Sequence, residues 1–159
     1  MKGKEAIKIR FQKATVKDIP KLISIEQKVA GLKIYSAMTK EKEWEEEIGK
    51  DNATVYLVMK DNVAVGDISY EKRNDGAYIS GLVVGPQFQG MGIGREIMRR
   101  IMEELKDVKK IELVTHPENG VAIKLYTSFG FAVKERKENY FGDGEPRIVL
   151  VKEQNTEKK

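Results

Sequence analysis

Two spacings of apolar residues alternate along the chain and predict strands and helices in a regular order. Apolar residues at every second position predict strands over residues 7–11, 54–59, 63–70, 77–84, 110–115, 131–137 and 147–151. Apolar residues three or four positions apart predict helices over residues 18–29, 40–48, 95–105 and 119–129. The order β-α-α-β-β-β-α-β-α-β-β favours an α+β fold in which helices cover a mixed sheet.

Turn-forming residues separate these segments. Asp61-Asn62 and Asn74-Asp75-Gly76 predict hairpin turns, so residues 54–84 should form an antiparallel meander. Asp18-Ile19-Pro20 is typical of a helix N-terminus, and Gly31 is expected to end that helix.

Composition narrows the class of protein. The chain has 159 residues, 40% hydrophobic and 34% charged, which fits one domain over residues 1–159 with a core of about 6–153. The polar ends, Met1 to Glu5 and Gln154 to Lys159, are expected to fray. The absence of cysteine excludes disulfides and thiol nucleophiles, and no apolar run predicts a membrane span or a signal segment. A cytoplasmic protein is the expectation. The net charge of +4, with lysine and glutamate interleaved, argues against nucleic acid as a partner.

A glycine-rich turn is the most informative local feature. Gln89-Gly90-Met91-Gly92-Ile93-Gly94 lies between an apolar strand and an amphipathic helix, where backbone N–H groups and the helix dipole favour an anion. A dinucleotide-binding turn would need a third glycine at Arg95, and a phosphate loop would need a following Gly-Lys-Ser/Thr. An ordinary glycine turn remains the alternative.

Three linked features give this turn a context: Leu82-Val83-Val84 with Pro86, the turn itself, and Asn119 followed by Ala122, Tyr126 and Gly130-Phe131. Over nearly the whole chain this combination resembles the GNAT superfamily of acetyl-CoA-dependent N-acetyltransferases. The resemblance implies a mixed, mostly antiparallel sheet of about seven strands flanked by about four helices. It also implies acetyl-CoA as cosubstrate and no metal.

The resemblance assigns a set of coenzyme-binding residues. The loop from Gly90 to Arg95 would hold the pyrophosphate, and the strand residues before it would pair with the pantetheine amides. Gln89 would close the turn or donate to phosphate, and Asn119 would contact the coenzyme or merely cap a helix. The full set is Leu82, Val83, Val84, Gln89, Gly90, Met91, Gly92, Ile93, Gly94, Arg95, Asn119 and Tyr126.

Amide formation from a thioester also needs a proton donor for the sulfur and a proton acceptor for the amine. Tyr126 matches the family's proton-donating tyrosine, with an ordinary core tyrosine as the alternative. The glutamate that ribosomal-protein acetyltransferases often carry five positions before Asn119 is replaced by Val114. Glu112 and His116 share strand parity with Val114 and are the candidate bases.

A water relay to Asp67 or Glu71 is a further option for the base. By analogy with the family, the Val84 N–H would stabilise the oxyanion. Candidates for the acceptor wall are Tyr35, Tyr140 and Phe141, and the acids placed to attract an amine are Glu26, Asp143 and Glu145. The run Glu45-Glu46-Glu47 is expected to be solvated surface.

The acceptor itself stays open. A protein N-terminus, a lysine or a small amine all fit a primary amine acceptor, and a homodimer is one option for the assembly. A non-catalytic acyl-CoA-binding sensor is the alternative function.

Overall fold

Seven strands form one sheet in the computed structural model, which describes residues 8–155. The strands are β1 (Arg10–Lys13), β2 (Ala53–Lys60), β3 (Val63–Arg73), β4 (Gly76–Val84), β5 (Lys110–Thr115), β6 (Ala132–Lys137) and β7 (Arg147–Glu153). Their order in the sheet is β1-β2-β3-β4-β5-β7-β6. The order of elements along the chain is the one that the hydrophobic spacing predicts. Ile7, the first residue of the predicted first strand, lies outside the described residues.

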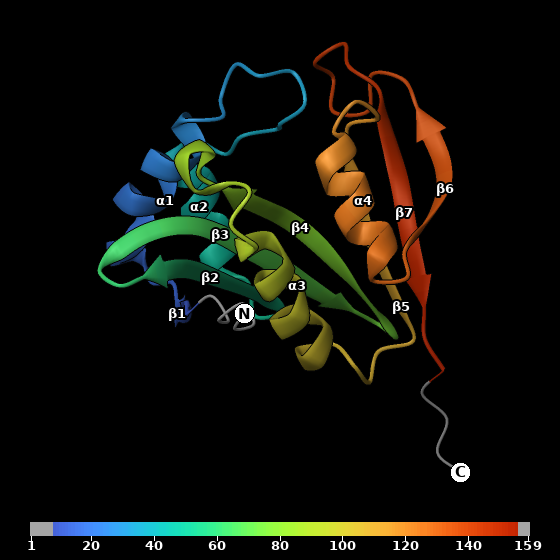
Figure 1. The fold of residues 1–159 in the computed structure, drawn as a ribbon, viewed down its shortest axis with the longest axis horizontal. Helices are drawn as coiled ribbons and strands as arrows, with labels where there is room; N and C mark the ends of the chain where they lie inside the picture. Colours follow the sequence, from blue (N-terminus) through green and yellow to red (C-terminus); the bar gives the residue numbers. More distant parts are fainter. Residues whose placement is uncertain (1–7, 156–159) are drawn as a thin grey trace, which may run out of the picture.

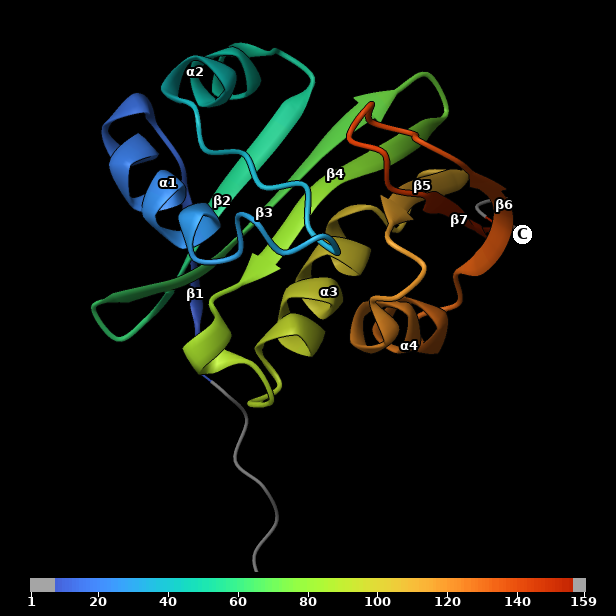
Figure 2. The same ribbon diagram turned by 90° about the horizontal axis from the view of Figure 1, so that it is seen from above.

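Four helices cover the two faces of the sheet. They are α1 (Ile19–Gln27), α2 (Glu41–Gly49), α3 (Ile93–Glu104) and α4 (Gly120–Ser128). Seen from above, α1 and α2 lie on one face, and α3 and α4 lie on the other (Figure 2). The fold prediction is therefore confirmed: an α+β arrangement with a mostly antiparallel sheet.

Each face has its own hydrophobic core. Ile97, Met98 and Ile101 of α3 are fully buried against the sheet, and Tyr126 of α4 joins the same cluster. On the opposite face, Leu22 of α1 and Trp44 of α2 pack in a second cluster. The amphipathic spacing of each helix thus fixes which side it turns to the sheet.

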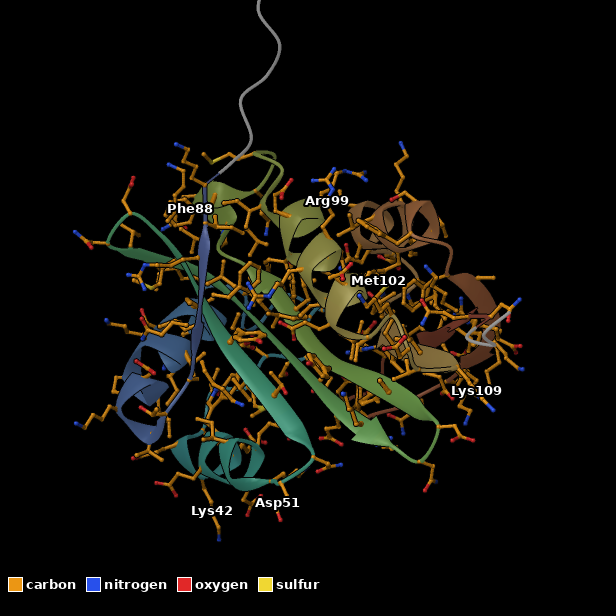
Figure 3. The ribbon with its side chains drawn as sticks, turned by 90° about the horizontal axis from the view of Figure 1, so that it is seen from below. Lys42, Asp51, Phe88, Arg99, Met102 and Lys109 are labelled. Atoms are coloured by element: carbon orange, nitrogen blue, oxygen red, sulfur yellow. The ribbon has the colours of Figure 1, made fainter. Side chains whose placement is uncertain are left out.

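One pair of neighbouring strands differs from all the others. The β4 and β5 strands are parallel, whereas every other pair is antiparallel. The connection between them runs through α3, and Phe88 and Lys109 mark its two ends (Figure 3). Parallel strands need such a crossover because the chain must return to the same edge.

The β4 and β5 strands separate after a short paired stretch. Their last paired residues are Ile79 and Leu113, although β4 continues to Val84, and the strands diverge visibly in Figure 1. A register shift places one extra residue, Ser80, in β4 opposite the Ser69–Tyr70 step of β3. Such a bulge bends the strand that carries it.

On its other side β4 is held close to β3. A Cβ at Gly66 would lie 2.5 Å from the carbonyl oxygen of Val83, so only glycine permits this approach. The end of β4 is therefore fixed to β3 and open toward β5.

Two local expectations need correction. The Asp18 carboxylate accepts from the Thr15 N–H at 2.9 Å in a 3-10 turn before α1, so its side chain does not cap α1 itself. Gln154 donates to the carbonyls of Leu105 and Val108, so the ordered chain extends beyond the predicted end of the core. The predicted fraying of Met1 to Glu5 and of residues 156–159 falls outside the described residues.

The predicted solvation of the acidic run on α2 is wrong at one position. Glu47 is buried, and its carboxylate accepts from the Lys50 ammonium at 3.1 Å. The helix turns this residue toward β3 because Glu47 lies three positions after the buried Trp44.

Candidate active site

A cleft of about 320 Å³ occupies the gap between β4 and β5. Residues from both faces of the sheet line it. From the face of α3 and α4 come Ile93, Gly94, Ala122, Leu125 and Tyr126. From the face of α1 and α2 come Glu26, Met38, Trp44 and Asp67. The cleft therefore connects the two faces through the sheet.

The glycine turn forms one wall of this cleft. Gly90 and Gly92 have φ angles of 83° and 86°, in the left-handed region that favours glycine. Gly92 is the N-cap of α3, and no side chain caps the helix. The first N–H groups of α3 thus lack a side-chain partner and lie at the positive end of the helix dipole, a suitable place for an anion.

Of the residues predicted to bind the coenzyme at the turn, some line the cleft and others do not. Gln89 closes the turn: its Nε2 donates to the Val84 carbonyl at 2.9 Å and to the Tyr35 hydroxyl at 3.2 Å. Met91 and Arg95 do not line the cleft. The Arg95 guanidinium lies instead over the Phe129 ring, 5.6 Å from its centroid.

The open edge of β4 presents backbone groups to the cleft. The Gly85 N–H donates to the Val65 carbonyl at 2.8 Å, so this pair of residues is a hydrogen-bonded pair of β3 and β4. Antiparallel pairing alternates, so the N–H and C=O of Val84 and of Leu82 point away from β3. The Gln89 hydrogen bond to the Val84 carbonyl agrees with this direction.

Tyr126 projects from α4 into the cleft. Its side chain is buried, and its hydroxyl has no hydrogen-bond partner within residues 8–155. Burial, with a smaller contribution from the nearby Tyr35, raises the pKa of Tyr126 above its ordinary value. The phenol therefore keeps its proton at neutral pH and can donate it.

Asn119 lines the cleft and also caps α4. Its Oδ1 accepts from the Ala122 N–H at 3.2 Å. The helix-cap alternative for this residue is thus observed, and its amide nitrogen remains available to the cleft.

The two candidate bases, Glu112 on β5 and His116 just after it, have different surroundings. His116 lines the cleft and is fully buried, but both ring nitrogens are engaged. Nδ1 accepts from the Glu118 N–H at 3.0 Å, which leaves the proton on Nε2, 2.8 Å from a Glu145 carboxylate oxygen. This tautomer has no free lone pair with which to take a proton.

Glu112 does not reach the cleft. Its side chain borders a separate hollow beside the β3–β4 turn and lies 3.4 Å from the Lys110 ammonium. Glu112 pairs with Tyr78 in the stretch where β4 and β5 are still together, which corrects the expectation that strand parity turns it toward the site.

Two buried acids face the cleft from the side of α1 and α2. Glu26 accepts from the Met38 N–H at 2.8 Å, and the Asp67 carboxyl has no hydrogen-bond partner among the described residues other than the Glu26 carboxyl. Burial and the neighbouring Glu26 carboxyl raise the pKa of Asp67 well above its usual range. Burial also raises the pKa of Glu26, against the opposing effects of Asp67 and the Met38 N–H.

Glu71, the other acid weighed as a relay, lies outside the cleft. Burial raises its pKa, but hydrogen bonds from Arg73 and Lys50 outweigh burial and lower the value to about 2. Glu71 is therefore a fixed anion and not a base.

Two loops meet over the side of the cleft that α1 and α2 border. The buried guanidinium of Arg147 donates to Ser36 Oγ at 2.7 Å and to Asp143 at 3.0 Å, and lies over the Phe141 ring. Arg147 thus joins the α1–α2 loop to the β6–β7 loop. Of the predicted wall residues, Tyr35 and Phe141 line the cleft, whereas Tyr140 packs against Phe141 and does not.

Several lining residues were missed from the sequence. They are Trp44, Ser69, Tyr78, Ser80, Gly81 and Arg147. One signal was available: Asp67 and Ser69 place polar side chains at alternate positions inside an otherwise apolar strand.

A strand edge left open by a diverging neighbour, with an uncapped helix start and a buried tyrosine on the same face of the sheet, is the arrangement expected of an acyltransferase that uses a coenzyme A thioester. Residues 22–131 match the model of the acetyltransferase (GNAT) family. The chain belongs to this family, whose members use acetyl-CoA as cosubstrate.

Curated relatives include proteins that acetylate a ribosomal protein. The chain is 40% identical over 76 residues to the UPF0157 protein YqkA of Bacillus subtilis, covering 48% of the chain and 22% of that protein. It is 25% identical over 118 residues to a putative ribosomal protein bS18-alanine N-acetyltransferase of Bacillus subtilis, covering 72% of the chain and 78% of that protein. The match to the Escherichia coli (strain K12) bS18-alanine N-acetyltransferase is 30% over 81 residues and covers 48% of the chain and 55% of the enzyme.

Solved structures share the fold. The ribosomal-protein-S18-alanine N-acetyltransferase of Escherichia coli superposes with a TM-score of 0.81 at 20% identity, covering 96% of this chain and 97% of that one. The PaiA N-acetyltransferase of Thermoplasma acidophilum, in complex with coenzyme A, gives 0.71 at 20% identity, covering 92% and 99%. These structures show that the chain has the fold of N-acetyltransferases.

Two kinds of feature are absent from residues 8–155. These residues contain no group of three or more histidine, aspartate or glutamate side chains arranged to hold a metal ion. None of the helices in this range has the length and apolar character needed to span a membrane.

Proposed function

We propose that this protein transfers an acetyl group from acetyl-CoA to a primary amine, with both substrates bound at once. The observation that carries the proposal is the cleft through the sheet, because it gives two substrates separate approaches to one point. No cysteine is present to carry the acetyl group, so direct transfer is the simplest course.

The residues of the α3 side fit a coenzyme. The N–H groups that follow Gly90 and Gly92 are free to bind the pyrophosphate, and both glycines already adopt the φ angles that open the turn. Leu82 and Val84 offer backbone groups to the pantetheine amides as an added strand would. Acetyl-CoA supplies an acetyl group already activated as a thioester.

Two groups of this chain are placed to assist the transfer. The Val84 N–H points to the open edge, where it can donate to the carbonyl oxygen as negative charge develops there. Tyr126 keeps its phenol proton and has no other partner in the described chain, so it can protonate the departing sulfur.

The proposed acceptor is a primary amine, and two classes of amine are candidates. The names of the bS18-alanine N-acetyltransferases favour a peptide N-terminus. A spermidine N-acetyltransferase among the proteins of similar fold favours a small polyamine. We further propose a cytoplasmic site of action, where acetyl-CoA is made, and a homodimer as the assembly to test by light scattering.

The test is thiol release from acetyl-CoA in the presence of single amines. Peptides with an N-terminal alanine, spermidine and a lysine peptide are the first panel, with the N-acetylated peptide as the matched control. Thiol release that requires a free amine supports the proposal. Tight coenzyme binding with no release for any amine would favour a non-catalytic acyl-CoA sensor.

A further inference from the structure

A row of polar side chains lies on the buried face of β3 beneath α1 and α2. Asp67, Ser69 and Glu71 alternate with Ile68 and Tyr70, and all five are buried. A strand with this alternation normally turns its polar side chains to water. Burying two carboxylates here costs stability, which calls for a functional or a structural reason.

The two ends of the row differ in charge balance. At one end, Glu71 accepts from Lys50 at 3.0 Å and from Arg73 at 2.8 Å, and Glu47 shares the same lysine. These acids are paired with cations, as buried charges usually are. They form a structural cluster outside the cleft.

At the other end, Glu26 and Asp67 have no cation. The other charged or titratable groups that line the cleft are His116 and Arg147, with Tyr35, Tyr78 and Tyr126. His116 is tied to Glu145 and Arg147 to Asp143, and a tyrosine side chain carries no positive charge. The acid pair thus faces the cleft without a counter-charge.

The free oxygens of the pair match a protonated amine. Glu26 uses Oε1 for the Met38 N–H, and the Glu26 and Asp67 carboxyl groups are hydrogen-bonded to each other, while no other group of the described chain donates to Asp67. An ammonium group has three N–H donors and no acceptor. The carboxyl oxygens of this buried pair that their mutual hydrogen bond leaves open are complementary acceptors.

The pair also lies where an acceptor must arrive. Asp67 is opposite Val83 in the β3–β4 register, one residue from the Val84 N–H. It lies toward α1, on the opposite side of the sheet from the glycine turn and Tyr126. The coenzyme and this acid pair therefore border the same gap from opposite faces.

We propose that Glu26 and Asp67 together bind the ammonium form of the acceptor and take its proton. The inference rests on the proposed N-acetyltransferase function and names the base for it. It replaces Glu112, which lies outside the cleft, and His116, whose nitrogens are both engaged.

The proton balance is simple. The pair, holding one shared proton and one negative charge, accepts a proton from R–NH₃⁺ and leaves R–NH₂. The amine nitrogen then bonds to the acetyl carbon while the C–S bond breaks. The sulfur leaves with the Tyr126 proton, and the new amide nitrogen returns a proton to the tyrosine. The pair releases its extra proton to water when the amide departs.

The experiment uses Asp67→Asn and Glu26→Gln, which keep shape and remove one carboxylate each. Glu47→Gln is the matched control, since Glu47 is a buried acid beside the same strand that does not line the cleft. Calorimetry measures the affinity of coenzyme A, and then of spermidine and of an alanine-terminated peptide for the protein saturated with coenzyme A. Thiol release gives the pH dependence of kcat/KM.

We expect amine affinity to fall about tenfold or more in both cleft variants, from lost hydrogen bonds to a charged group. Coenzyme affinity should change less than about twofold. In Asp67→Asn the acidic limb of the kcat/KM profile should move to higher pH, because the Asp67 hydrogen bond that lowers the pKa of Glu26 is replaced by a weaker one from the amide. A merely structural pair would lower thermal stability without moving that limb.

Unchanged amine affinity and an unchanged pH profile in both variants would overturn the inference. Equal losses in Glu47→Gln would also overturn it. The proposed function fails separately: a wild-type protein that binds coenzyme and amine but never releases thiol is not an acetyltransferase. In that case the amine affinities of the variants still decide whether the pair is the ammonium site.

Discussion

Replacing Asp67 with asparagine should stabilise the protein, and the gain should grow as the pH rises. Asp67 is 1% exposed, and burial together with the Glu26 carboxyl raises its pKa well above the usual range. An acid whose pKa rises on folding stabilises the folded state below its unfolded pKa. That contribution is lost as the pH rises through the folded pKa. The wild-type protein is therefore destabilised at neutral pH by the buried Asp67 carboxyl.

The size of the gain follows from the missing hydrogen bonds. Leaving a buried polar group unpaired costs about 1–3 kcal/mol. The amide of the introduced asparagine would donate to Glu26 in place of the shared proton, but its carbonyl would stay unpaired, so the lower half of that range, about 1–2 kcal/mol, applies. For a chain of this size each kcal/mol moves Tm by about 2–4 °C, giving a rise of about 2–8 °C.

Circular dichroism melts of both proteins, from about pH 4 to about pH 8, provide the assay. Near pH 4 the two should melt together, because the aspartate is then largely protonated in the folded protein and partly so in the unfolded chain. A Tm difference that is constant over the whole range would refute the reasoning, as would a less stable variant at neutral pH. The same variant is expected to be poorer at binding amines, so stability and function should move in opposite directions.

Three further predictions concern the donor side and the sheet. Tyr126→Phe should lower kcat about 10²-fold with coenzyme affinity unchanged; equal rates in a thiol-release assay would remove the tyrosine from the mechanism. Gly66→Ala places a Cβ 2.5 Å from the Val83 carbonyl and should cost more than about 2 kcal/mol in urea unfolding; a loss below about 0.5 kcal/mol would show that β4 shifts freely. Gly92→Ala, at a φ of 86°, should cost about 1–2 kcal/mol and weaken coenzyme A binding; calorimetry showing full affinity would contradict the role of this turn.

Local patterns predicted much of this molecule. The spacing of apolar residues determines which segments are strands and which are helices, and turn residues such as Asn74-Asp75 mark where a hairpin closes. The sequence alone could point to the glycine turn and Tyr126 because both belong to a motif whose residues have a fixed spacing. These features depend on residues that are close in the chain.

Features that depend on distant segments could not be found in this way. Strand parity predicts the face of the sheet to which Glu112 points. It does not predict that β4 and β5 are still paired next to this residue. The engagement of His116 depends on Glu145, 29 residues further along the chain. The burial of Asp67 depends on where α1 and the loop after it pack. The alternating pattern of β3 predicts that one face of the strand is exposed to water, whereas both faces are covered.

The gap between β4 and β5 has a consequence for inhibitor design. A compound that joins coenzyme A to an amine head group would pass through the sheet, and backbone atoms of two strands would set the length of its linker. Changes in the surface loops would leave that length unaltered. The coenzyme half could therefore be kept constant, while the head group, varied against Glu26 and Asp67, would report which amines this protein prefers.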